Sequence, residues 1–146
     1  LYVKRIAAMS EDVLVAVCCD KPAIHRFPAV MARRIHALCI SVATGHRGKA
    51  ERIWRDVGSG AELYRRLRAL PGFGDEKARI FIALLAKRFG VRPDGWEAAA
   101  GAFADDRPRT VADIHDAASL AVVREWKKAQ KVAGKDKQDR AMKPGP

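Results

Sequence analysis

Apolar residues recur at helical spacing along almost the whole chain, and no long segment alternates with a period of two. The first helix is expected to follow an N-cap at Ser10 and to run to about Cys18, with acidic residues in its first turn. Pro28 suits the first turn of a second helix, and Gly45 is expected to end it. The apolar stripe of this second helix consists of Met31, Ile35, Leu38 and Val42.

Further helices are predicted after Gly45. A short one covers residues 50–57, and another covers residues 63–70 with its arginines on the face opposite its leucines. Residues 78–89 form the longest apolar helix, which is apolar on more than one face and is therefore expected at the buried centre. A short helix at 96–100 and a final helix capped by Asp116 complete the pattern. The sequence thus predicts an all-α fold, a compact bundle of short helices.

Composition supports one globular domain. The chain has 146 residues, of which 49% are hydrophobic and 31% charged, and this is too apolar for a disordered chain. No apolar run reaches the roughly 18 residues that span a bilayer, and the N-terminus lacks the layout of a signal peptide. The 3 cysteines, two of them adjacent, make no disulfide framework. We therefore expect a cytoplasmic monomer that makes no membrane contact.

The charge of the chain indicates a polyanionic partner. The 28 lysines and arginines exceed the 17 acidic residues, and the net charge is +11. One basic segment is residues 134–146, which lack apolar periodicity and are expected to form a disordered tail after a helical domain at residues 1–133. Such a tail could equally serve only to keep a protein dissolved. The other basic residues crowd one stretch: Arg65, Arg66, Arg68, Lys77, Arg79, Lys87 and Arg88.

That stretch contains the sharpest motif of the chain, which lies between two predicted helices. It reads Leu70-Pro71-Gly72-Phe73-Gly74-Asp75-Glu76-Lys77-Ala78. Two glycines separated by one residue permit a tight turn with positive φ, and the helix after the turn adds its N-terminal amides and dipole. Such a turn can bind a phosphate without any side chain. The alternative is an ordinary corner between helices that needed glycine.

The motif closely resembles the helix–hairpin–helix DNA-binding motif with the pattern Leu-Pro-Gly-x-Gly. Residues 7–131 resemble the HhH-GPD superfamily of base-excision DNA repair proteins, in particular a branch of small bacterial members without an established activity. The resemblance implies a DNA-glycosylase-like helical fold, double-stranded DNA as the partner and association with the nucleoid. It implies DNA contacts from Leu70, Pro71, Gly72, Phe73, Gly74, Lys77 and Arg79, with Arg65, Arg66 and Arg68 as further sequence-independent contacts.

The resemblance also implies catalytic residues. Members of the superfamily extrude a base from the duplex, and an aspartate stabilises the developing charge on the sugar or activates water. The matching residue is Asp94, which lies 18 residues after Glu76. Trp96 is the candidate to line the base pocket. The alternatives are that Asp94 only caps the helix near Trp96 and that Trp96 is a core residue.

Three departures from the family pattern restrict the expected chemistry. Glu76 stands where bifunctional members carry a lysine, so Schiff-base lyase chemistry is not expected. The chain begins at Leu1 in what resembles the second family helix, so we expect the first core helix to be lacking. No cysteine-rich tail comes after the last helix. His36 and Cys39 share a helix face, but buried thiols in helices are commoner than zinc ligands at such positions. We therefore expect no metal and no cofactor.

Three functions are compatible with these residues. The first is a base-excision repair enzyme, at most a monofunctional DNA N-glycosylase. The second is a non-catalytic helix–hairpin–helix DNA-binding module, which Glu76 and the lacking first helix favour. The third is a basic RNA-associated protein, because related hairpins occur in that context too.

Overall fold

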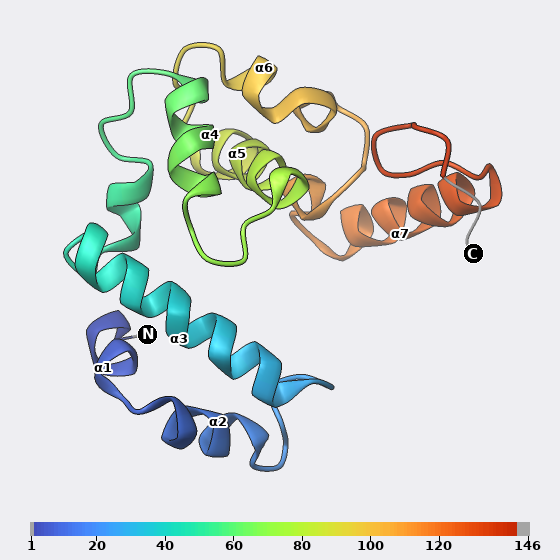
Figure 1. Cartoon of the computed structure of the whole chain (residues 1–146). Coiled ribbons are helices and arrows are strands. Elements are labelled where there is room, and N and C mark those ends of the chain that lie inside the picture. The colour runs from blue at the N-terminus through green and yellow to red at the C-terminus, as the bar shows by residue number, and fades with distance from the viewer. Residues whose placement is uncertain (1, 143–146) are drawn as a thin grey trace. The chain divides into compact units, whose positions relative to one another are not determined.

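The computed structural model describes residues 2–142 (Figure 1). The described residues are mostly helical, and among them only isolated β-bridges occur, with no strand. The expected all-α class is therefore confirmed. No helix within residues 2–142 is long and apolar enough to cross a membrane.

The chain divides into two compact units, which are described separately. Unit 1 comprises Leu1–Asp56 and Arg66–Phe73, and unit 2 comprises Val57–Arg65 and Gly74–Pro146. The α-helices are α1 (Val3–Ala8), α2 (Glu11–Cys19), α3 (Pro28–Gly45), α4 (Gly60–Arg68), α5 (Asp75–Phe89), α6 (Trp96–Ala100) and α7 (Ala117–Val132). Short 3-10 turns are η1 (Ala50–Ile53), η2 (Gly101–Ala104) and η3 (Val111–Asp113).

Two predicted helix starts are confirmed by their hydrogen bonds. The Ser10 hydroxyl accepts from the Val13 amide at 3.4 Å at the start of α2. The Asp116 carboxylate accepts from the Ser119 amide at 2.7 Å at the start of α7, in a capping box. Helix α1 was not among the helices predicted from the apolar pattern, and its start has no side-chain cap.

In unit 1, α1 and α2 both pack against α3 (Figure 1). Leu14 and Cys18 of α2 form the core cluster with Ala32 of α3. The predicted α3 stripe was partly wrong, because its first three residues are only half-buried and the buried residues are Ala32, His36, Cys39 and Val42. The small Ala32 side chain permits close packing of α3 against α2. The buried face of α3 is therefore the one that contains Ala32, and it is displaced by one residue from the predicted stripe.

His36 and Cys39 are both buried in unit 1, and burial was expected only for the thiol of Cys39. The His36 ring contacts the Met9 carbonyl through Nε2 at 3.0 Å, so this buried polar group has a main-chain partner. Burial raises the pKa of the Cys39 thiol. All 3 cysteines are free thiols.

In unit 2, α5 is the buried helix that the sequence predicts. Ile82 and Leu85 are buried along it, and it packs against α6, η2 and η3. Phe103 of η2 is only 1% exposed and is the largest fully buried side chain of the described residues. Phe89 lies in the last turn of α5, before the left-handed Gly90, and is 69% exposed.

The described residues after α7 fold back in a closed turn. Lys135 and Ala141 form an antiparallel bridge, and the Met142 amide donates to the Gly134 carbonyl at 2.8 Å. Arg109 donates to the Lys137 carbonyl at 2.8 Å and pairs with Asp139 at 2.8 Å. Of the segment expected to be a disordered tail, residues 134–142 have these contacts, and residues 143–146 lie outside the described part.

Candidate nucleic-acid interface

The predicted hairpin turn forms directly after α4. Leu70 is buried, and its carbonyl accepts from the Phe73 amide at 3.1 Å. Gly72 has φ +77°, a conformation that disfavours any side chain. A Cβ built at Gly72 would meet nothing within 4 Å, so the space on that side of Gly72 is open. Arg68 holds the turn from the end of α4 by donating to the Phe73 carbonyl at 2.7 Å.

Helix α5 begins where the turn ends. Gly74 is its N-cap with ordinary φ −73°, and within the described structure no side chain caps this helix. The Gly74 carbonyl accepts from the Ala78 amide at 3.0 Å, which closes the first turn. A Cβ at Gly74 would also meet nothing within 4 Å. A helix start that lacks a side-chain cap leaves room for an anion at its amides.

The first turn of α5 carries two carboxylates, and each has a cationic partner. Asp75 accepts from Arg79 Nε at 2.9 Å and from the Tyr64 hydroxyl at 2.6 Å. Glu76 pairs with Lys137 Nζ at 2.7 Å. These ion pairs offset the negative charge that would otherwise repel a phosphate at the helix start.

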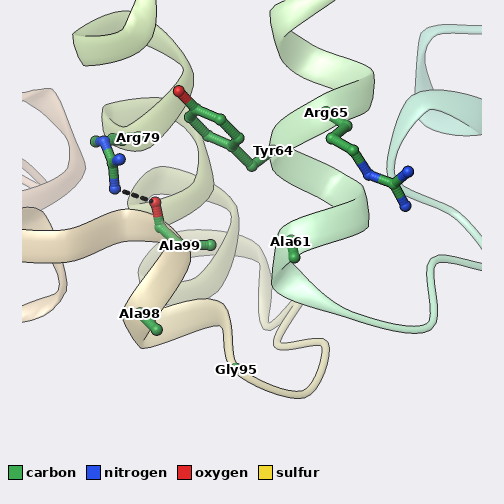
Figure 2. Close-up of a pocket in the computed structure, with 7 residues that line it drawn as sticks. All are labelled: Ala61, Tyr64, Arg65, Arg79, Gly95, Ala98 and Ala99. Atoms are coloured by element: carbon green, nitrogen blue, oxygen red, sulfur yellow. Dashed lines mark hydrogen bonds between the residues drawn. The ribbon is translucent and has the colours of Figure 1, made fainter.

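The expected basic face of α4 is not one uniform surface. Arg66 and Arg68 both donate to main-chain carbonyls, Arg66 to those of Arg52, Ile53 and Arg55. In Figure 2 the Arg65 side chain points away from the ring of Tyr64. Lys77 is exposed on α5, whereas Arg79 is engaged inside unit 2. The arginines of this stretch therefore serve local structure as well as surface charge.

A hollow of about 350 Å³ opens beside α6 in unit 2 (Figure 2). The Tyr64 ring and small residues form its wall, and the Arg79 guanidinium lies over that ring at 5.1 Å from its centre. Arg79 Nη1 donates to the Ala99 carbonyl at 3.0 Å, which fixes the guanidinium in place. The lining residues are Ala61, Tyr64, Arg65, Arg79, Gly95, Ala98 and Ala99.

The hollow lies next to the predicted catalytic segment but does not contain its side chains. Asp94 is exposed, and its main-chain carbonyl accepts from the Gly60 amide at 2.8 Å. Trp96 is half-buried at the start of α6, and neither residue lines the hollow. The N-cap of α6 is Gly95 at φ +73°, with no side-chain cap, so the Asp94 carboxylate does not cap this helix.

Tyr64 is the functional candidate that the sequence pattern did not reveal. It lies on α4 between the leucines of the apolar stripe and the arginines, so its position on the helix is that of a boundary residue. Its partners Asp75 and Arg79 come from α5, and Ala99 comes from α6. No local signal in the sequence indicates that these segments meet.

No protein-family model, curated protein or solved structure matches this chain. The resemblance to helix–hairpin–helix repair proteins therefore rests on the residues of the motif and of its surroundings.

Proposed function

We propose that this chain is a DNA-binding protein of the base-excision repair class that contacts the duplex backbone through its hairpin. The observation that carries the proposal is the glycine turn at residues 70–74, where Gly72 has φ +77°, the Cβ positions of Gly72 and Gly74 are open, and the next helix begins without a side-chain cap. Backbone amides that surround such a turn can donate to phosphate oxygens whatever the base sequence.

Charge makes the same partner favourable at longer range. The net charge of +11 attracts a polyanion, and the pairing of Asp75 and Glu76 with cations removes the local repulsion at the hairpin. Binding through phosphates releases counterions, so affinity should fall steeply as salt rises. A protein that binds in this way is expected to tolerate any duplex sequence.

In the enzymatic form of the proposal, the hollow beside α6 receives an extruded base. A planar base could stack on the Tyr64 ring, and the small side chains of Ala98 and Ala99 leave space for it. Asp94, adjacent in sequence to the lining residue Gly95, would be the carboxylate that stabilises charge at the sugar. Because Glu76 is a carboxylate, base release would proceed without a Schiff base at that position.

The alternative is a non-catalytic DNA-binding module. The observation that favours it is the exposure of Asp94, whose side chain does not line the hollow. A catalytic carboxylate usually has a shaped, partly dehydrated environment that perturbs it. This alternative retains the hairpin contact and predicts no base release.

The binding step is tested with Gly74→Val. Gly74 has an ordinary φ and open space around its Cβ, so valine should fold normally while its methyl groups obstruct the approach of a phosphate. Loss of one charge-assisted hydrogen bond is worth about 1.5 kcal/mol, so duplex affinity should fall about tenfold. Gly45→Val, also at an open position, is the matched control, and fluorescence anisotropy with a labelled duplex gives both affinities. Equal affinity of the two variants would remove the hairpin from the interface, and preference for structured RNA in competition would redirect the proposal.

The catalytic step is tested separately on a panel of damaged duplexes. Ala98→Phe should fill the hollow and abolish base release while duplex affinity stays within a few-fold. Ala121→Phe, on the exposed surface of α7, is the control for an added aromatic ring. Asp94→Asn should likewise abolish release without loss of binding. Binding without base release from any lesion would select the non-catalytic alternative.

A further inference from the structure

A second cationic cluster lies in unit 1, outside the hairpin motif. Lys49, Arg52 and Arg55 are spaced three residues apart around η1. Arg52 lies within η1, Lys49 is its N-cap residue, and Arg55 comes two residues after its end. One short segment of backbone therefore carries all three charges, and their side chains line the same hollow.

These side chains surround a hollow of about 330 Å³. Its lining consists of Lys49, Arg52, Arg55, Asp56 and Arg66, all of which belong to unit 1. Four of the five lining side chains are cationic and one is acidic. The hollow in Figure 2, by contrast, is lined mainly by small residues and a tyrosine.

The frame behind this hollow is held by Arg66. Its Nη1 lies 3.4 Å from the Arg52 carbonyl, 3.4 Å from the Ile53 carbonyl and 3.2 Å from the Arg55 carbonyl. The Arg52 and Ile53 carbonyls belong to η1 and the Arg55 carbonyl follows it, and carbonyls at the end of a helical turn lack an amide partner within that turn. Ile53 is only 4% exposed and anchors the turn in the core. The backbone that carries Lys49, Arg52 and Arg55 is thus fixed before any ligand arrives.

Three of the cationic side chains around the hollow make no polar contact that stabilises the described part of the fold. Lys49, Arg52 and Arg55 are exposed, and within residues 2–142 their side chains make no hydrogen bond or ion pair. Like charges held around one hollow repel one another, and a single carboxylate, that of Asp56, does not offset them. An anion that several cations can contact at once relieves this repulsion. A phosphate group has that charge and several oxygens, and guanidinium groups bind it through paired hydrogen bonds.

We infer that this hollow is a phosphate-binding site, separate along the chain from the hairpin. The identity of the natural ligand, a phosphodiester of the DNA backbone, rests on the proposed function. The inference that the hollow binds phosphate does not depend on that function. Arg66 is a positioning residue that fixes the η1 turn, and Lys49, Arg52 and Arg55 contact the phosphate oxygens. Asp56 lowers the affinity and limits how strongly the hollow holds an anion.

The first test uses tripolyphosphate as the probe and monitors backbone amide shifts of the full chain by NMR. Amides of residues 49–56 should shift on titration, and Arg52→Gln with Arg55→Gln should weaken the affinity about tenfold or more, as expected for two lost charge-assisted contacts. Because neither side chain has a partner in the described structure, this double variant should fold normally. Arg34→Gln with Arg124→Gln removes the same charge from exposed positions elsewhere and should change the affinity less than about twofold.

The substitution Asp56→Asn should raise the affinity for tripolyphosphate, whereas the arginine substitutions lower it. Asp56 has φ +59°, which asparagine also tolerates, so the backbone is preserved while the acidic charge is lost. Affinity for tripolyphosphate should rise about threefold, an increase that no loss of folding can produce. An unchanged or weaker affinity in Asp56→Asn, or equal affinities of the two double variants, overturns the site.

Duplex binding then separates this inference from the proposed function. If both hold, the double variant should lower the slope of log affinity against log salt by about 2, because two phosphate contacts are lost. Duplex binding that depends on Gly74 but not on Arg52 and Arg55 overturns the phosphodiester ligand and leaves the hairpin intact. Tripolyphosphate binding in a chain that binds no duplex overturns the proposed function and retains the phosphate site.

Discussion

Arg109 shows how a single residue organises the described end of unit 2. Its side chain is 4% exposed, and its guanidinium donates to Asp105 through Nε at 2.9 Å and Nη2 at 2.7 Å. It also lies over the Trp126 ring, at 5.3 Å from the ring centre. The hydrogen bond with Asp105 raises the pKa of Arg109 further above its ordinary value, so the group stays charged at every accessible pH. A buried charge of this kind is stable only with its partners in place.

We expect Arg109→Met to lower the free energy of unfolding by about 2–3 kcal/mol. Removing one partner of a buried ion pair costs about 3–5 kcal/mol, and this cost is reduced here because Asp105 and Asp139 remain partly hydrated. Urea denaturation monitored by circular dichroism measures the change. Arg107→Met is the control, because Arg107 pairs with the same carboxylates but is 58% exposed, and its loss should cost less than about 1 kcal/mol.

The same network predicts an acid-sensitive stability. The hydrogen bond from Arg109 lowers the pKa of Asp105 and also that of Asp139 below the ordinary value of 3.8. A depressed folded pKa contributes stability that is present above 3.8 and is lost as pH falls through the lower, folded value. Unfolding free energies measured from pH 6 downward should therefore fall below about pH 4. The fall should be shallower in Arg109→Met, and parallel curves for the two proteins would contradict this assignment.

At the scale of elements, the start of α4 and the segment before α6 touch through their backbones. Ser59 and Asp94 form a parallel bridge, and the Gly60 amide donates to the Asp94 carbonyl at 2.8 Å. A Cβ at Gly60 would lie 2.6 Å from the Gly95 carbonyl oxygen and 2.7 Å from the Trp96 Cα. Glycine is therefore required at position 60 because the two backbone segments approach closely, and not because of its φ angle. This contact holds Ala61 and Gly95 on the wall of the hollow in unit 2.

Gly60→Ala is accordingly expected to force these backbone segments apart. Overpacking of a rigid contact costs about 1–3 kcal/mol, and the bridge to Asp94 should weaken with it. The measurement is the urea midpoint together with hydrogen exchange of the Gly60-position amide, which should become faster. Gly74→Ala, at an open position with ordinary φ, is the matched control and should leave the free energy of unfolding within about 0.5 kcal/mol. If the urea midpoint of Gly60→Ala equalled that of the control, the backbone contact would accommodate a Cβ without loss of stability.

At the scale of the whole molecule, the chain passes between its units more than once. Helix α4 begins in unit 2 and ends in unit 1, and the hairpin turn ends where unit 2 resumes at Gly74. Neither unit is a continuous stretch of sequence, so neither can be obtained by a single cut. The described part of the segment after α7 belongs to unit 2 and reaches back to it through Lys137 and Asp139.

A chain ended at Ala133 is expected to be less stable than the full chain. It would lose the partners of Arg109 at Lys137 and Asp139, the pairing of Glu76 with Lys137, and the hydrogen bond from Gln130 to Asp139. The expected loss is about 2 kcal/mol, measured by urea denaturation of both chains. Lys128→Gln with Lys135→Gln in the full chain is the control for reduced charge. Identical unfolding of the shortened and full chains would mean that residues 134–146 add nothing to the fold.

The helices of this protein could be predicted from local patterns because their causes are local. Ser10 and Asp116 cap their helices with side chains a few residues away, and the apolar spacing of α5 already indicated a buried helix. The stripe of α3 was displaced by one residue because the face that is buried depends on where Ala32 meets α2. The exposure of Phe89 is a similar case, since hydrophobicity alone does not distinguish the last turn of a helix from its middle.

For the candidate sites, the sequence by itself determined the hairpin, because the glycine spacing and the start of the next helix are properties of adjacent residues. It also determined the all-α class and the excess of positive charge. Only the tertiary structure decided that Tyr64, Arg79 and Ala99 enclose a hollow, that Lys137 pairs with Glu76, and that Arg66 holds the basic turn at Arg52 and Arg55. These groups are brought together by contacts between segments far apart in the chain, and no local pattern of residue types records such contacts.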